Sequence, residues 1–207
     1  MYNIVLSETD RQNIYKNSSI SFIFDPEGNI VRHINFTALN SAGKVAAKVE
    51  ILNNTSTLVS TPPPNEVFRN QNIWVGNAGW ATERNIIDAT VVFTVEKSWI
   101  TENNIDESSI TLCRYSGDAW HELVTRKIAE DANSLQFEAE TTGFSPFAVS
   151  GKKTMGETGA EGIIEPTVTA EKTPAPTPTE EKGMPGFGLF AGMSILLIAV
   201  QLLRKNN

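Results

Sequence analysis

The chain has 207 residues, a formal net charge of −7 and a single cysteine. An acidic chain with no basic stripe is unsuited to a phosphate backbone, so nucleic acid is excluded as an expected partner. Residues 1–150 suffice for one domain with a substantial core. Cys113 alone can form no disulfide within the chain.

The first ten residues, Met1 to Asp10, contain neither a basic start nor an apolar run. A secretory signal has both. If the protein is exported, the chain is the carboxy-terminal piece of a longer protein or its start is misplaced. The remaining explanation is a tail that inserts after synthesis and leaves the domain in the cytosol.

Apolar and polar residues alternate from Ile20 to Val149, which is typical of half-buried strands. A first strand is expected from residue 20 to residue 24. The Pro, Gly and Asn residues of segment 25–29 then predict a tight reversal into a second strand over 30–39. The next strand is expected to turn Val45, Ala47, Val49 and Ile51 to the core and Lys44, Lys48 and Glu50 to solvent.

The clearest alternation, and therefore the expected central strand, turns Ile87, Ala89, Val91, Phe93 and Val95 to one face. Segments 110–115 and 119–124 flank Ser116-Gly117-Asp118, which predicts a second hairpin. Two more strands are expected over 135–139 and 144–149. About seven to nine short strands without a convincing helix predict an all-β fold, an antiparallel β-sandwich of the immunoglobulin-like type over residues 1–150.

The side chains that could carry chemistry form no recognisable catalytic or zinc motif, so no catalytic residue, metal ligand or cofactor is expected. Cys113 is expected to be a small apolar filler, since a catalytic thiol would need His33 or His121 beside it. The acidic loop 101–109 and the turn at Asp25 are interpreted as solvated surfaces, with calcium binding as the alternative.

Trp74, Trp80 and Trp99 could together form a surface on which sugar rings stack, because an indole presents a flat apolar face. The alternative is that these aromatic side chains fill the core or shield strand edges. Trp80 lies in a stretch between strands and is expected to be the most exposed tryptophan.

Four asparagines, Asn17, Asn35, Asn53 and Asn54, begin Asn-X-Ser/Thr sequences. These sequences accept N-linked glycans if the chain meets an external glycosylation system. Asn53 and Asn54, in a polar turn after a strand, are better candidates than Asn35, which is expected in mid-strand.

The composition changes beyond residue 150. Residues 151–183 are rich in Thr, Pro and Gly and poor in large apolar groups, which predicts a disordered stalk similar to those of O-glycosylated surface proteins. Residues 184–203 are almost wholly apolar and would span about 30 Å as a helix, so they predict one transmembrane segment. Arg204 and Lys205 follow, and the positive-inside rule places this basic end in the cytoplasm and the domain outside.

Met184-Pro185-Gly186-Phe187-Gly188, followed by the apolar run and the basic pair, resembles the archaeal PGF carboxy-terminal sorting signal. The preceding domain resembles the PGF-pre-PGF domain of methanogen surface proteins. Four segments carry that second resemblance: Asn72–Asn77, Val95–Ile100, Asn104–Asp106 and Gly143–Ala148. The resemblance implies export, cleavage near Pro185, Gly186 and Phe187 by an archaeosortase, and covalent attachment of the new end to a membrane lipid.

The sequence therefore predicts a non-enzymatic, membrane-proximal structural module at the archaeal cell surface. Its expected partners are membrane lipid, an archaeosortase-like enzyme and other envelope components. A carbohydrate-binding or adhesive module on the same anchor is the main alternative. A hydrolase or thiol enzyme, and a cytosolic domain behind a plain tail anchor, are further alternatives.

Overall fold

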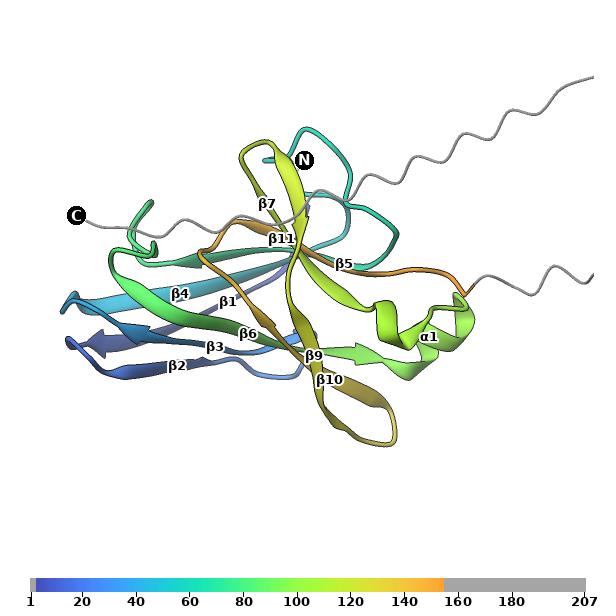
Figure 1. Ribbon diagram of the computed structural model, residues 1–207, viewed down its shortest axis with the longest axis horizontal. Helices are drawn as coiled ribbons and strands as arrows, with labels where there is room; N and C mark the ends of the chain where they lie inside the picture. The colour runs from blue at the N-terminus through green and yellow to red at the C-terminus, as the bar shows by residue number, and fades with distance from the viewer. Residues whose placement is uncertain (1–2, 155–207) are drawn as a thin grey trace, which may run out of the picture. The chain divides into compact units, whose positions relative to one another are not determined.

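The computed structural model describes residues 3–154, which form two antiparallel β-sheets packed face to face (Figure 1). The six-stranded sheet has the order β1 (Ile4–Ile14), β4 (Gly43–Leu52), β5 (Glu66–Val75), β11 (Pro146–Gly151), β7 (Thr111–Ser116) and β8 (Ala119–Glu122). The five-stranded sheet has the order β2 (Ser19–Ile23), β3 (Val31–Ala38), β6 (Ile86–Glu96), β10 (Ser134–Glu140) and β9 (Thr125–Glu130). The all-β antiparallel sandwich is confirmed.

Two short helical segments follow β6, namely α1 (Lys97–Glu102) and the 3-10 turn η1 (Glu107–Ser109). Within residues 3–154 no helix is long and apolar enough to cross a membrane. The stalk, the apolar segment 184–203 and the sorting motif lie outside the described residues.

Both expected hairpins are present. Strands β2 and β3 pair with Ile20 opposite Phe36, and β7 pairs with β8 so that Ser116 lies opposite Ala119. The two residues between β7 and β8, Gly117 and Asp118, have φ angles of 57° and 62°. Two successive positive φ values are the backbone of a type I′ turn, whose twist matches that of the strands it joins.

The core lies between the sheets and follows the alternation of the strands. The expected inward residues of β4, Val45 to Ile51, are all buried in it. Strand β6 is the middle strand of its sheet, as expected, and its Phe93 stacks on Phe137 of β10 with ring centroids 5.6 Å apart. Burying one such ring contributes roughly 1.5–3 kcal/mol, so these central strands supply much of the stability.

Ile87 corrects the expected pattern of β6. Its side chain is 48% exposed, and the preceding Ile86 is buried in its place. The register between β3 and β6 shifts between Asn35 and Thr37, and Asp88 has a φ of 54°. An irregularity of this kind inserts one extra residue and reverses which side chains point inward.

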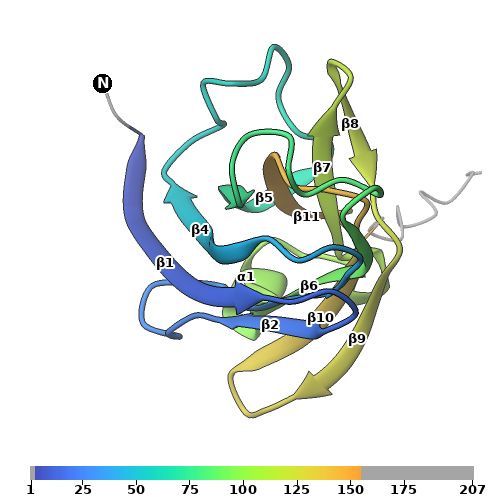
Figure 2. The same ribbon diagram turned by 90° about the vertical axis from the view of Figure 1, so that its left-hand side faces the viewer.

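Strand β1, which the sequence pattern does not predict, lies beside β2 of the other sheet at one side of the sandwich (Figure 2). Asp10 Oδ2 accepts a hydrogen bond of 3.1 Å from the backbone N–H of Ile23, and Gln12 Nε2 donates to the carbonyl of Ser21. Both backbone partners belong to the edge strand β2. These side chains occupy backbone groups that an open edge would offer to another chain.

The first and last strands of the domain run in opposite directions, because β1, β4, β5 and β11 alternate in direction across the sheet. The start of β1 and the end of β11 therefore lie at the same end of the sandwich. There the backbone N–H of Thr154 donates to the carbonyl of Asn104, at 2.7 Å, and fastens the end of the domain to the segment after α1.

Candidate functional site

The loop between β4 and β5, residues 53–65, crosses the outer face of the six-stranded sheet (Figure 2). At its start, Asn3 Nδ2 donates to the carbonyls of Asn54 and Thr55 at 2.9 and 3.0 Å. Further on, the Tyr115 hydroxyl of β7 accepts from the backbone N–H of Ser60 at 3.2 Å. The loop thus joins two neighbouring strands but is also fixed to β7, two strands away from β5, and it covers the sheet between them.

Polar side chains of β4 and β5 lie beneath this loop. Glu50 and Asn72 face each other across the two strands, and Asn70 lies opposite Leu52. All three polar residues are buried, with Glu50 8% and Asn72 6% exposed. The sequence correctly turns Glu50 away from the core, but the loop removes it from solvent.

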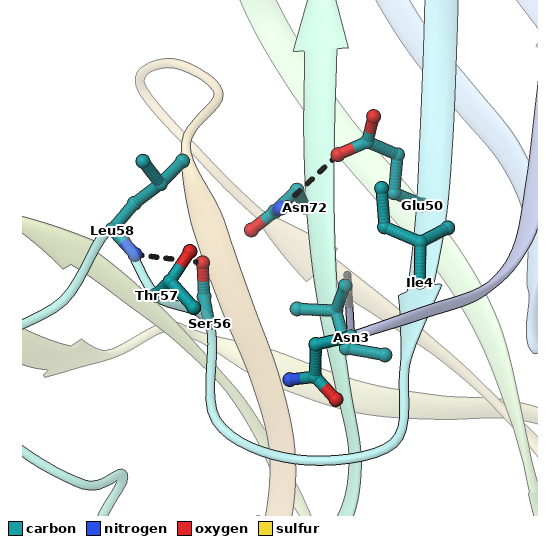
Figure 3. Close-up of a pocket in the computed structure, with 8 residues that line it drawn as sticks. Asn3, Ile4, Glu50, Ser56, Thr57, Leu58 and Asn72 are labelled. Carbon is teal, nitrogen blue, oxygen red and sulfur yellow. Dashed lines mark hydrogen bonds between the residues drawn. The ribbon is translucent and has the colours of Figure 1, made fainter. Parts of the chain in front are cut away.

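A cavity of about 430 Å³ lies between the loop, the start of β1 and this polar part of the sheet (Figure 3). Its wall is partly polar and partly apolar. The lining residues are Asn3, Ile4, Glu50, Leu52, Ser56, Thr57, Leu58 and Asn72. In Figure 3 the apolar side chains of Ile4 and Leu58 stand on opposite sides of the space, with Asn72 and Glu50 behind them.

Glu50 is held in place by three donors. Its Oε2 accepts from Asn72 Nδ2 at 3.1 Å and from Trp74 Nε1 at 3.3 Å, and its Oε1 pairs with Lys48 Nζ. Burial raises the pKa of Glu50, but the hydrogen bonds from Lys48, Asn72 and Trp74 outweigh burial and hold the pKa below its ordinary value of 4.5. The cavity wall therefore carries an ionised, oriented carboxylate at neutral pH.

The other half of the Asn72 amide, Oδ1, has no hydrogen-bond partner within residues 3–154. Because a carboxylate only accepts hydrogen bonds, the Asn72 NH₂ group faces Glu50 and Oδ1 is turned toward the loop (Figure 3). Among the described residues nothing donates to Asn72 Oδ1, and the same holds for Asn70 Oδ1. Buried acceptors without donors are rare in folded proteins.

The structure does not bring the three candidate tryptophans together. Trp74 lies on the outer face of β5 and donates to Glu50. Trp80 follows the end of β5 and is half-buried rather than exposed, with its ring 6.1 Å from that of Phe36. Trp99 lies in α1 at the opposite end of the sandwich, 5.0 Å from Phe68. Each indole shields its own part of the domain.

The candidate glycosylation sites differ in accessibility. Asn17, in the turn between β1 and β2, is exposed, as are Asn53 and Asn54 in the β4–β5 loop. Asn35 lies in β3, as expected, where its Nδ2 donates to Thr90 Oγ1 at 3.3 Å. Three of the four side chains are therefore open to solvent.

The remaining titratable candidates lie apart from one another. Cys113 is fully buried with its sulfur 3.5 Å from Ser150 Oγ, and burial raises the pKa of its thiol. His33 belongs to the other sheet. His121 lies opposite Arg114, the residue after Cys113 in β7, and so faces the other side of the sheet from Cys113. Neither histidine therefore lies beside the thiol on the same face.

The acidic loop 101–109 is engaged in local structure. Asp106 caps η1 by accepting from the backbone N–H of Ser108 at 2.9 Å, and Glu107 pairs with Lys127 at 2.6 Å. The turn at Asp25 is similar, since Asp25 accepts from the backbone of Glu27. Across residues 3–154, no group of three or more His, Cys, Asp or Glu side chains is arranged to hold a metal ion.

No family model, curated protein or solved structure matches the chain.

Sequence reasoning missed the cavity. One signal was available: Asn70, Gln71 and Asn72 place three amides in a row in β5, on both faces of a strand in the middle of the sheet. Such a run interrupts the usual alternation by placing an amide on the core face as well, but it does not show that a loop covers the outer face. It does not identify the covering segment, because the loop is fixed by contacts with Asn3 and Tyr115, more than 50 residues away in the sequence.

Proposed function

We propose that the protein is a non-enzymatic structural module of a cell envelope, held at the outer surface of the membrane through its carboxy-terminal sequence. The observation that carries this proposal is the order of features after the domain. A Thr/Pro-rich segment comes first, then Pro185-Gly186-Phe187, an apolar run of membrane-spanning length, and Arg204-Lys205. Each feature alone is common, and their order is what resembles the PGF sorting signal.

The domain has properties that suit such a role. Its two sheets are joined by a continuous apolar core, and Asp10 and Gln12 close the edge between β1 and β2. A closed edge reduces unwanted pairing between neighbouring copies, which matters where many copies are crowded at a surface. Exposed Asn17, Asn53 and Asn54 are open to glycan attachment. The finer assignment, an immunoglobulin-like sandwich of the PGF-pre-PGF type, belongs to the same proposal.

The residues with direct chemical roles are then substrates of other enzymes. An archaeosortase-like membrane enzyme cuts near Pro185, Gly186 and Phe187 and joins the new end to a membrane lipid. Arg204 and Lys205 hold the apolar segment in its orientation until it is cut. The anchored form retains the sandwich and the stalk.

Mass spectrometry of the carboxy-terminal peptide, recovered from membranes of cells that contain an archaeosortase, tests the proposal. The wild-type chain is expected to end near Phe187 and to carry a lipid. Phe187→Ala should accumulate at full length, and so should a chain without Arg204 and Lys205. The matched controls are Phe190→Ala, a like change within the apolar run, and removal of Asn206 and Asn207.

Two results would overturn this assignment. One is a wild-type chain that keeps residues 188–207 in the membrane fraction. The other is a lipid-linked, shortened product that Phe187→Ala leaves unaltered.

A further inference from the structure

The cavity beneath the β4–β5 loop contains an acceptor that the described residues leave unsatisfied. Asn72 is 6% exposed, its NH₂ group is used by Glu50, and its Oδ1 lies against the cavity without a donor (Figure 3). A buried acceptor gains from an O–H or N–H donor that arrives from outside the chain. The unpaired oxygen and the adjacent space are separate observations, and both point to a bound molecule.

On the loop side of the cavity, the hydroxyl groups of Ser56 and Thr57 can form hydrogen bonds with the same molecule. Ser56 Oγ accepts from the backbone N–H of Leu58 at 3.3 Å, which leaves its own hydrogen free to donate. Thr57 is exposed at the cavity mouth. One wall thus offers acceptors, Asn72 Oδ1 and the Glu50 carboxylate, while the loop offers hydroxyl groups that both donate and accept.

The apolar part of the cavity wall further restricts the class of ligand that fits. Leu58 is 59% exposed and Ile4 is 38% exposed, and both line the cavity. A large apolar side chain left open beside buried polar groups matches a ligand that has C–H faces and O–H edges. A sugar ring has both. The volume of about 430 Å³ falls within the roughly 300–1,000 Å³ of sites for small molecules.

We propose that this cavity binds a neutral saccharide, with ring hydroxyls on Asn72 Oδ1, Glu50 and Ser56 and the apolar ring face on Leu58. The site differs from the surface suggested by Trp74, Trp80 and Trp99. It goes beyond the structural role proposed above and does not depend on the anchor. Because a folded domain at any location retains the cavity, failure of one proposal leaves the other standing.

Three other ligand classes fit less well. A calcium ion takes 6–8 oxygen ligands, whereas the side chains with free oxygen acceptors here are few and only Glu50 is charged. An ammonium ligand would compete with Lys48, whose Nζ already pairs with Glu50. An anionic sugar would meet the negative charge of Glu50 at close range.

The test is a titration of the full-length chain, isotopically labelled, in a detergent without a sugar headgroup. The probes are the methyl glycosides of glucose, mannose, galactose and N-acetylglucosamine, with glucuronate, calcium chloride and methylammonium as the competing classes. Amide shifts are recorded for each. At least one neutral glycoside is expected to give saturable shifts confined to residues 3–4, 50–58 and 70–74.

Two variants probe opposite walls. Leu58→Ala should weaken binding by roughly threefold to tenfold, because it removes apolar contact from an exposed side chain. Asn72→Ala should weaken it by a comparable or larger factor by removing the unpaired acceptor. The matched control is Ile23→Ala, since Ile23 is 63% exposed on the other sheet and should leave the affinity unchanged. The amide spectrum of each variant reports whether the domain remains folded.

The proposal is overturned if no neutral glycoside produces saturable shifts. It is equally overturned if calcium, methylammonium or glucuronate alone produces them at this site. Binding that survives both Leu58→Ala and Asn72→Ala in folded proteins places the sugar elsewhere and also defeats the assignment.

Discussion

Replacement of Gln71 by methionine should stabilise the protein. Gln71 is fully buried, and its neighbours across the sheet, Ile51 and Phe147, are both core residues, so its side chain points into the core. Neither Nε2 nor Oε1 has a hydrogen-bond partner among the described residues. Methionine has a similar length and no polar group that requires a partner.

The size of the effect follows from the unpaired amide. A buried polar group without a partner costs about 1–3 kcal/mol, and a swap of similar volume in a core usually costs less than about 1.5 kcal/mol in packing. After the packing cost is subtracted, we expect Gln71→Met to raise the free energy of unfolding by roughly 1 kcal/mol, with about 3 kcal/mol as the upper limit. For a domain of this size each kcal/mol raises Tm by roughly 2–4 °C.

Urea unfolding of the full-length chain, followed by tryptophan fluorescence, measures this change. The matched control is Gln136→Met. Gln136 lies on the outer face of β10, between the inward residues Leu135 and Phe137, and its replacement should change stability by less than about 0.5 kcal/mol. If Gln71→Met lowers the unfolding midpoint while Gln136→Met does not, the amide is satisfied in solution and the reasoning fails.

Three further perturbations test other parts of the structure. Gly76→Ala should destabilise the domain by about 1–3 kcal/mol, because Gly76 has a φ of 70° and an added Cβ would lie 2.9 Å from Trp80 Cε3. The control is Gly79→Ala, which has a φ of 78° but open space around it and should cost less stability. Equal losses of stability in thermal unfolding would contradict a clash between the added Cβ and Trp80. The folded-state pKa of Glu50 lies below 4.5, so Glu50 contributes stability above that value and loses it as the pH falls through the folded pKa. The stability difference between the wild type and Glu50→Gln, measured by urea titration, should therefore shrink below pH 4.5. A difference that stays constant with pH would show that folding leaves the pKa of Glu50 unchanged. Burial raises the pKa of the Cys113 thiol, so native protein should react with a thiol reagent far more slowly than urea-unfolded protein. Comparable rates would mean that the sheet around Cys113 opens readily to solvent.

Local patterns were sufficient for much of the sandwich. The β2–β3 and β7–β8 hairpins follow from turn residues and period-two alternation, both of which depend on neighbouring residues. The same rule placed Val45 to Ile51 in the core and β6 in the middle of its sheet. It failed at Ile87, where a shift in register against β3 reverses the alternation.

Features set by distant contacts were not predictable in this way. Strand β1 has a half-exposed pattern because it is an edge strand, so its ten-residue pairing with β4 leaves little trace in hydropathy. The burial of Glu50 depends on a loop held by Asn3 and Tyr115. The separation of Trp80 and Trp99 depends on the opposite directions of the strands that precede them. Each result follows from topology, which the alternation of one strand does not encode.

Asn3 and Thr154 lie toward the same end of the sandwich, so the domain adds less than its full length to any chain that continues from both points. Tension applied through these points would act first on β1, whose pairing with β4 begins at that end with Ile4 opposite Leu52. The pairs between β1 and β4 would separate one after another, from Ile4 toward Ile14. Strand β11 is held on both sides, by β5 and β7, and would resist longer. Such a domain would unfold in stages under force. Detachment of the edge strand β1 would lengthen the chain first, while the remaining strands keep their pairing.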